Sequence, residues 1–457
     1  MIPLYALLVV ANLPAGPDGT SGGPDALRNP QAVQEVRSGK RTEANAAWWG
    51  FDPEDATEAL QDAIRSGAKR VVVPNVGRDW IVRPVQLAGR QELVLEPGVV
   101  IAAKRGEYRG GGDTVFSAAS VDDLVIRGAG ATIRMNKEDY IGGGVLKNMG
   151  WNRWFGQYDK AEWRSGLVIR GGHNVRVEGL TIRDTGGDGI MIAGAGGQPW
   201  ATDVHLKDIT FDNNYRQGIS VISVDGLVVE GCLFKNTWGT PPSSGVDIEP
   251  DTKDETIKRL VFRDCRFEDN YGDGIEVFLG NLKTKTGDVS ILFDRCRVSS
   301  RWGSGIRVTR IHDDGPGGLV EFRDCLVENT QGYGIKVQDK SAGGARVRFV
   351  RCTVRNASQN RGYQGAWTPV WLNRPHPDLV RKLGGIEFVD CAIEDNHSRP
   401  ALLADGEGGS ALTDVKGKLR ISSPAGARVQ WQGEAGSVAI EVTEVKASKT
   451  SGVAGPR

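Results

Sequence analysis

Apolar residues in the middle of the chain return in one short pattern: a glycine, then two apolar residues on either side of a variable one. The six copies begin at Gly189, Gly218, Gly245, Gly274, Gly305 and Gly334. A repeat of nearly constant length indicates stacked structural units, none of which can bury its apolar face alone. The alternation of apolar and variable positions predicts a short strand in each unit.

A second pattern of apolar positions fixes the register of the units. Valine or phenylalanine lies three positions before each cysteine, and another apolar residue lies two positions after it. The six cysteines are Cys232, Cys265, Cys296, Cys325, Cys352 and Cys391. Because they share one repeat position, we expect them to be reduced, buried and stacked as small apolar residues. Zinc sites use paired cysteines two residues apart, and the sequence has no such pair.

The repeats lack helical spacing, so each unit is predicted to contain two or three short strands joined by turns. Parallel stacking of such units gives a solenoid with coils ~4.8 Å apart. On these motifs the chain resembles the right-handed parallel β-helix of the pectate lyase and polygalacturonase superfamily, over about residues 55–405. The expected fold is therefore all-β, a solenoid of roughly ten coils with an N-terminal capping helix.

Segments outside the repeats set the expected boundaries. Residues 1–16 contain an apolar run like that of a secretory signal, although no Lys or Arg precedes it. Residues 17–46 are rich in Gly, Pro and polar residues, which predicts a flexible tether. The amphipathic segment 55–66 predicts a helix that covers the open end of a β-helix spanning 47–405. The remaining chain is expected to form a C-terminal β cap at 406–445 and a loose tail at 446–457.

Composition and charge narrow the classes of function that we expect for the protein. The chain has 57 basic and 57 acidic residues, so no basic surface for nucleic acid is expected. No run of eighteen apolar residues occurs, so no membrane-spanning helix is expected. The signal-like segment and the resemblance to exported enzymes favour a secreted or periplasmic protein. We expect a monomer whose partner is a polysaccharide.

Charged residues gather at the variable repeat position of adjacent units. That position points outward, because its two apolar neighbours point inward. Read along the units, it holds Met191, Ser220, Asp247, Glu276, Arg307 and Lys336. An acidic patch is expected from Asp247, Glu249, Asp251, Asp273 and Glu276, followed by Arg307, Arg310, His312 and Lys336. Aromatic residues form a further column along a turn, at Tyr215, Trp238, Tyr271 and Trp302.

Several interpretations of these columns remain open. In one interpretation, opposite charges on neighbouring coils form only a surface salt-bridge ladder, which contributes little to stability. The solenoid is alternatively a non-catalytic glycan-binding protein, or an enzyme that cleaves polysaccharide. A lyase acting on a uronate needs a positive charge at the sugar carboxylate, a base and an acid. An acidic cluster beside Arg or Lys supplies these parts if it binds Ca²⁺ through Asp247, Glu249, Asp251 and Asp273, with Lys336 or Arg307 as base.

A glycoside hydrolase needs two carboxyl groups instead, about 5 Å apart for retention or ~6.5–9.5 Å apart for inversion. Asp247 and Glu276 on adjacent coils fit the shorter separation. The resemblance to polygalacturonases is incomplete, because Arg216-Gln217 and Ser243-Ser244-Gly245 stand where that family carries paired aspartates and Gly-His-Gly. We therefore favour an enzyme of the lyase type narrowly over a hydrolase.

The predicted site follows from these columns. The expected catalytic residues are Asp247, Glu276, Arg307 and Lys336. The expected substrate-binding residues are Asp188, Arg216, Trp238, Tyr271, Trp302 and Arg310. An insertion at 137–165, rich in Tyr and Trp, interrupts the repeats and either contacts sugar or packs a loop. Glu162 and Arg164 at its end are further candidates.

Overall fold

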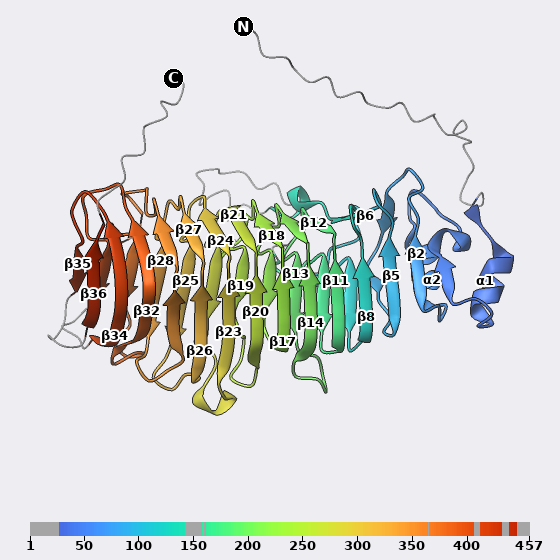
Figure 1. The fold of residues 1–457 in the computed structure, drawn as a ribbon. Coiled ribbons are helices and arrows are strands. Elements are labelled where there is room, and N and C mark those ends of the chain that lie inside the picture. Colours follow the sequence, from blue (N-terminus) through green and yellow to red (C-terminus); the bar gives the residue numbers. More distant parts are fainter. Residues whose placement is uncertain are drawn as a thin grey trace, which may run out of the picture.

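The computed structural model of the protein describes residues 27–141, 158–159, 161–363, 365–405, 412–431 and 438–445. Within these residues the chain winds into one elongated solenoid, whose coils follow one another from the N-terminal to the C-terminal end (Figure 1). The predicted signal segment at 1–16 and the predicted tail at 446–457 lie outside the described residues. No helix in the described ranges is long and apolar enough to cross a membrane.

Three stacks of parallel strands form the walls of the solenoid. The first stack contains β1 (Glu43–Asn45), β2 (Arg70–Val73), β5 (Gln91–Leu95), β8 (Asp122–Arg127), β11 (His173–Glu178), β14 (Ala201–Lys207), β17 (Val224–Glu230), β20 (Ile257–Arg263), β23 (Val289–Asp294), β26 (Gly318–Arg323), β29 (Arg346–Val350), β32 (Leu383–Glu394), β34 (Leu412–Ser422) and β36 (Val438–Glu444). The second contains β3 (Trp80–Val82), β6 (Val100–Ala103), β9 (Thr132–Arg134), β12 (Thr181–Arg183), β15 (Thr210–Asp212), β18 (Leu233–Lys235), β21 (Arg266–Asn270), β24 (Arg297–Ser300), β27 (Leu326–Glu328) and β30 (Thr353–Arg355). Because the long strand β32 pairs with both β29 and β30, these two stacks join into one 24-stranded sheet.

The third stack is a separate 12-stranded sheet that carries the repeated glycine motif. Its members are β4 (Val85–Gln86), β7 (Phe116–Ala119), β10 (Leu167–Arg170), β13 (Ile190–Ala193), β16 (Ile219–Val221), β19 (Val246–Ile248), β22 (Ile275–Phe278), β25 (Ile306–Ile311), β28 (Ile335–Lys340), β31 (Val370–Asn373), β33 (Leu402–Asp405) and β35 (Val429–Trp431). In the described residues this sheet has twelve strands, each from a different coil, so the coils exceed the roughly ten predicted. The all-β solenoid itself is confirmed.

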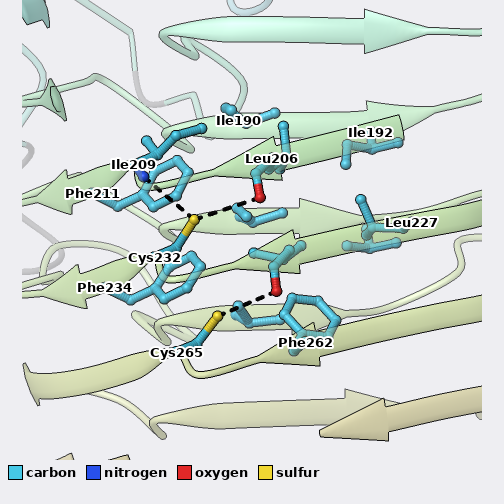
Figure 2. Packing of buried hydrophobic residues seen from close by; sticks show 14 of the residues in the cluster. Ile190, Ile192, Leu206, Ile209, Phe211, Leu227, Cys232, Phe234, Phe262 and Cys265 are labelled. Carbon is cyan, nitrogen blue, oxygen red and sulfur yellow. Dashed lines mark hydrogen bonds between the residues drawn. The ribbon is translucent and has the colours of Figure 1, made fainter. Parts of the chain in front are cut away.

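The cysteine column lies in the interior as predicted. All six cysteines are free and buried; five of them lie directly before a strand of the second stack, and Cys391 lies within β32. Figure 2 shows Cys232 and Cys265 one above the other beside the stacked rings of Phe211 and Phe234, whose centroids are 4.8 Å apart. The Cys265 thiol lies 3.5 Å from the carbonyl oxygen of Val229 in the preceding coil. The thiols therefore behave as small core residues and link neighbouring coils weakly.

The N-terminal end is capped by more structure than the sequence suggested. The predicted helix at 55–66 is confirmed as α2 (Thr57–Arg65), which buries Leu60 and Ile64 against the first coil. The prediction of a tether at 17–46 is wrong for residues 30–45, where α1 (Pro30–Arg37) and β1 form and β1 pairs with β2. Asn29 caps α1, and Ala32 and Val36 are buried. The buried face of this short helix consists of two apolar residues one turn apart.

The solenoid also continues beyond the predicted boundary at 405. β34 pairs along its length with β32 and β36, and β35 pairs with β33. The predicted separate C-terminal cap at 406–445 is therefore, in its described part, a continuation of the same stacks. Val415, Leu419 and Ile421 keep the inward apolar pattern. The Gly-Ile motif that marked earlier coils is lost, which is why the sequence pattern seemed to end.

Candidate functional site

The outer face of the 12-stranded sheet changes from apolar to charged between β16 and β19. On its N-terminal side, Val168, Met191, Ala193 and Ile222 form a small apolar cluster. On its C-terminal side, the strand register places Asp247 opposite Glu276, Glu276 opposite Arg307, and Arg307 opposite Lys336. The predicted outward column is thus correct in its order.

The prediction that this column is solvent-exposed is wrong for its acidic members. Asp247 has 1% of its surface exposed, and Asp273 and Glu276 have 6% each. Arg307 and Glu249 remain partly accessible, each with 33% of the side chain exposed. We call the group the charged ladder. It comprises Asp188, Arg216, Asp247, Glu249, Asp273, Glu276, Arg307 and Lys336.

Arg216 holds the first carboxylates of the charged ladder together. Its guanidinium nitrogens lie 3.7 Å from Asp188, 3.5 Å from Glu249 and 3.5 Å from Glu162. Asp188 is completely buried, and neither of its carboxyl oxygens has a hydrogen-bond partner among the described residues. Burial therefore raises the pKa of Asp188 to about 7, although Arg216 opposes the rise. At neutral pH this carboxyl group is close to half protonated.

Asp247 lies at the centre of the charged ladder. Gln217 Nε2 donates a hydrogen bond to Asp247 Oδ2 at 2.5 Å. Burial, together with the charges of Glu276 and Glu249, raises the pKa of Asp247 well above its usual range. An acid in this environment keeps its proton at neutral pH, because removing it would place a second negative charge beside Glu276 and Glu249.

Glu276 and Arg307 form the next rung. Arg307 Nη1 lies 3.3 Å from Glu276 Oε1 and 3.7 Å from Asp273 Oδ2. Asp273 is fixed in turn, since its Oδ1 accepts a hydrogen bond from the Ser304 amide at 2.5 Å. Burial raises the pKa of Glu276 to about 7, partly opposed by Arg307. The guanidinium thus remains charged beside a carboxyl group that titrates near neutrality.

Lys336 ends the charged ladder and has a different environment. Its ammonium group lies 5.0 Å from the ring centroid of Trp371 and 5.6 Å from that of Tyr333. Within the described part of the chain, Lys336 forms no ion pair with a carboxylate. Burial, followed by the neighbouring charge of Arg307, lowers the pKa of Lys336 to about 8. A half-buried amine of this kind is suited to accept a proton.

The predicted calcium site is not assembled. Among the described residues, no three His, Cys, Asp or Glu side chains are grouped so that they could hold a metal ion. Of the four predicted ligands, Asp247 is bound by Gln217, Glu249 by Arg216 and Asp273 by Arg307. The fourth, Asp251, is exposed. Three of the four predicted ligands thus each have an arginine or amide partner.

The aromatic column lines a different part of the surface. Trp238 and Tyr271 border a hollow of about 530 Å³, and none of the four predicted catalytic residues is among its lining residues. The Trp238 indole is fixed by a 2.8 Å hydrogen bond from Nε1 to Asn213 Oδ1 and by the Lys137 ammonium, 4.2 Å from the ring centroid. Tyr271 stacks on the exposed Trp302 at 6.3 Å. The hollow also contains Arg183, Asp212, Asn213, Asn236, Thr237, Asp269 and Arg301.

Of the other described candidate residues, one joins the charged ladder and the rest do not. Glu162 joins the charged ladder through Arg216, whereas Arg164 is buried and donates to the carbonyl oxygens of Tyr108, Arg109 and Asp159. Arg164 is thus structural. Arg310 packs at 5.7 Å over the ring of Phe278 and is not part of the charged ladder. Trp151 and other aromatic residues between 142 and 157 lie outside the described residues.

Trp371 is a further residue of the outward column that the sequence pattern did not reveal. It lies opposite Lys336 in the register of β28 and β31 and so extends the outward column by one coil. The signal was present as Val370-Trp-Leu372, which has the apolar-variable-apolar spacing of the repeat without its glycine. The long segment before β31 lengthens this repeat, so β31 does not follow the regular spacing of the motif.

Comparison with known proteins agrees with this architecture. A family model described as a right-handed beta helix region matches residues 157–289. The SPbeta prophage-derived protein YorA of Bacillus subtilis (strain 168) is 23% identical over 303 residues, which are 60% of this chain and 48% of that protein. This chain therefore spans about half the length of that relative.

Solved structures show the same fold at low sequence identity. The A-module of the mannuronan C-5 epimerase AlgE6 of Azotobacter vinelandii aligns with a TM-score of 0.59 and 14% identity, covering 89% of this chain and 99% of that one. The Dettilon tailspike protein aligns with a TM-score of 0.51 and 12% identity, covering 88% and 68%. The chain accordingly has the fold of a right-handed parallel β-helix.

Proposed function

We propose that the protein acts on a uronate-containing polysaccharide by removing the proton next to the sugar carboxylate, with Lys336 as the base. The observation that carries the proposal is the position of Lys336, an amine beside Arg307 with no carboxylate partner in the described structure. A lysine pKa of about 8 leaves roughly one tenth of the amine neutral at pH 7. Most surface lysines have a far smaller neutral fraction.

Arg307 supplies the positive charge that this chemistry needs. The proton next to a carboxylate becomes acidic only when the negative charge that develops on the carboxylate is stabilised. Arg307 is one strand from Lys336, so the two side chains begin about 5 Å apart. One third of the Arg307 side chain is exposed, and its contacts with Glu276 and Asp273 leave other guanidinium donors for a substrate carboxylate.

Glu276 completes the reaction as the acid. In a β-elimination, Lys336 takes the proton from C5, the electron pair forms the C4–C5 double bond, and the bond from C4 to the glycosidic oxygen breaks. The leaving oxygen then takes a proton from Glu276. Because burial raises the pKa of Glu276 to about 7, this carboxyl group still holds a proton over part of the neutral range. Lys336, Arg307 and Glu276 then fill the three roles.

A glycoside hydrolase built on Asp247 and Glu276 is the second candidate. The two carboxyl groups are opposite each other on adjacent strands, as retention of configuration would require. Asp247, however, accepts a hydrogen bond from Gln217, and burial raises its pKa well above the usual range, so it stays protonated and is a poor nucleophile at neutral pH. The likeness in fold to a mannuronan C-5 epimerase also favours a uronate and chemistry at C-5.

The products of the reaction test the proposal. The protein would be incubated with alginate, polygalacturonate and neutral polysaccharides, and ultraviolet absorbance, reducing ends and proton NMR spectra would be followed. A lyase yields unsaturated uronates, which absorb in the ultraviolet. Reducing ends without absorbance would indicate the hydrolase, and altered NMR spectra without chain cleavage would indicate epimerisation. No change in any uronate polymer would count against the proposed function.

A further inference from the structure

A second hollow is lined by lysines. It lies at the opposite ends of the strands of the 12-stranded sheet from the aromatic hollow. Its volume is about 760 Å³. The lining residues come mainly from the loops that follow β13, β19, β22 and β25, including the loop that projects below β23 in Figure 1. The lining residues are Trp200, Lys253, Asp254, Thr256, Lys258, Lys283, Thr284, Lys285, Thr286 and Asp314.

The charge of this hollow is only partly compensated. Lys283 pairs with Asp314 at 2.9 Å, and Lys253 pairs with Asp254 at 2.7 Å. Among the described residues, Lys258 and Lys285 form no ion pair. Two positive charges therefore remain unpaired in one concave surface, where they raise the local concentration of anions.

The loops around the hollow are tied to one another. The short 3-10 helix η4 (Thr284–Thr286) is bonded on one side to the loop of the next coil, because Thr284 Oγ1 donates to Asp314 O at 3.0 Å. On the other side, Thr286 Oγ1 donates to Lys253 O at 2.8 Å. Lys253, Lys285 and Asp314 are thus carried on three adjacent coils whose spacing is fixed. Such an arrangement can meet a polymer at several points.

The chemistry of the lining indicates the class of ligand. Trp200 stands in the hollow with 38% of its surface exposed, and an amphipathic indole beside cations suits the face of a sugar ring next to its acidic group. The volume exceeds that needed for one small anion and falls within the usual range of ligand sites, about 300–1,000 Å³. The four lysines outnumber the two aspartates.

We propose that this lysine hollow, defined by Lys253, Lys258, Lys283, Lys285 and Trp200, is a second binding site for an acidic polysaccharide chain, distinct from the charged ladder. The inference rests on the proposed uronate substrate. Strands β19, β22 and β25 carry Asp247, Glu276 and Arg307 of the charged ladder, and the loops that follow these strands carry most of the hollow. A long acidic polysaccharide bound at the charged ladder reaches the hollow when it extends past the ends of these strands. The hollow then retains polymer during turnover.

The test measures binding separately from turnover. The double variant Lys258→Ala/Lys285→Ala would be compared with its parent in a Lys336→Met background, by affinity gel electrophoresis and calorimetry with alginate and polygalacturonate. Lys69→Ala/Lys207→Ala serves as the matched control, because both residues are exposed lysines without an ion pair in the described structure. Neutral dextran and single-stranded DNA are the control polymers.

We expect the Kd for the uronate polymer to rise about three- to twentyfold at low salt in the double variant, and the difference to shrink at high salt. Trp200→Ala should weaken binding without changing its salt dependence. The inference is overturned if the double variant binds uronate polymer like the parent or the control variant. It is also overturned if only DNA binding falls, or if dextran binding falls equally. Failure of the proposed chemistry would appear instead as absent products with polymer binding intact.

Discussion

Replacement of Asp188 by asparagine tests the electrostatic description of the charged ladder without reference to any substrate. Asp188 is completely buried, lacks a hydrogen-bond partner for either oxygen among the described residues, and faces Arg216 only at 3.7 Å. Asparagine keeps the shape of the side chain but cannot ionise. Asp188→Asn should therefore stabilise the protein at alkaline pH.

The magnitude follows from the two ionisation equilibria. In the unfolded chain the carboxyl group titrates near 3.8, whereas in the folded protein its pKa is about 7. Between these values the folded state keeps a proton that the unfolded state has released, so stability falls as pH rises through this window. The full penalty is present above pH 7. At 1.36 kcal/mol for each pH unit it amounts to about 4 kcal/mol, and it vanishes below about pH 4.

Thermal unfolding between pH 4 and 9 measures this difference. Unfolding entropy of about 2.1 cal/mol/K per residue gives about 1 kcal/mol/K for this chain, so Asp188→Asn should raise Tm by about 4 °C at pH 8 and hardly at all at pH 4. Asp264→Asn is the control of opposite sign, since Arg295 holds the pKa of Asp264 below its usual range. A variant of Asp188 whose Tm parallels the wild type at every pH, or drops below it as pH rises, would refute the assigned burial.

Three further predictions concern the core, the aromatic hollow and the pH dependence. Cys296→Ser should lower the free energy of unfolding by about 1–2 kcal/mol, because a hydroxyl group replaces a buried thiol, and the six thiols should react with a thiol reagent only on unfolding. We expect the aromatic hollow to stack one sugar of a bound chain, so Trp238→Ala should weaken binding of uronate oligosaccharides about tenfold with little effect on kcat, because the charged ladder is intact. The rate should peak near pH 7.5, midway between the pKa values of about 7 for Glu276 and about 8 for Lys336, because the acid must be protonated and the base neutral. A rate that rises continuously through pH 9 would remove Glu276 from the role of acid.

Most of the fold was accessible from the sequence because a solenoid repeats its local signals. The glycine motif and the cysteine column recur once per coil, so each coil confirms the register of the next. The two ends were harder to predict. α1 docks through only Ala32 and Val36, and the last coils keep the apolar alternation after the glycine motif has gone. At both ends of the solenoid the sequence lacks the repeated motif that made the central coils predictable.

The column of candidate residues was predicted in its order but not in its environment. Alternation along a strand tells which residues point outward, and the register then places Asp247, Glu276, Arg307 and Lys336 in one column. It does not tell whether an outward residue is covered. The partners of the carboxylates, Arg216 and Gln217, come from turns whose paths the period does not fix. For the same reason, the separation of Trp238 and Tyr271 from the charged ladder was not foreseen.

The most direct test of the proposed chemistry is the initial rate of unsaturated uronate formation by Lys336→Met. Methionine keeps the length and packing of the side chain against Trp371 and Tyr333 but cannot accept a proton. We predict a fall in rate of about 10²-fold or more on the uronate polymer that the wild-type protein cleaves, with Tm and polymer binding retained. A Lys336→Met protein that forms unsaturated products within a few-fold of the wild-type rate would contradict the assignment of Lys336 as the base.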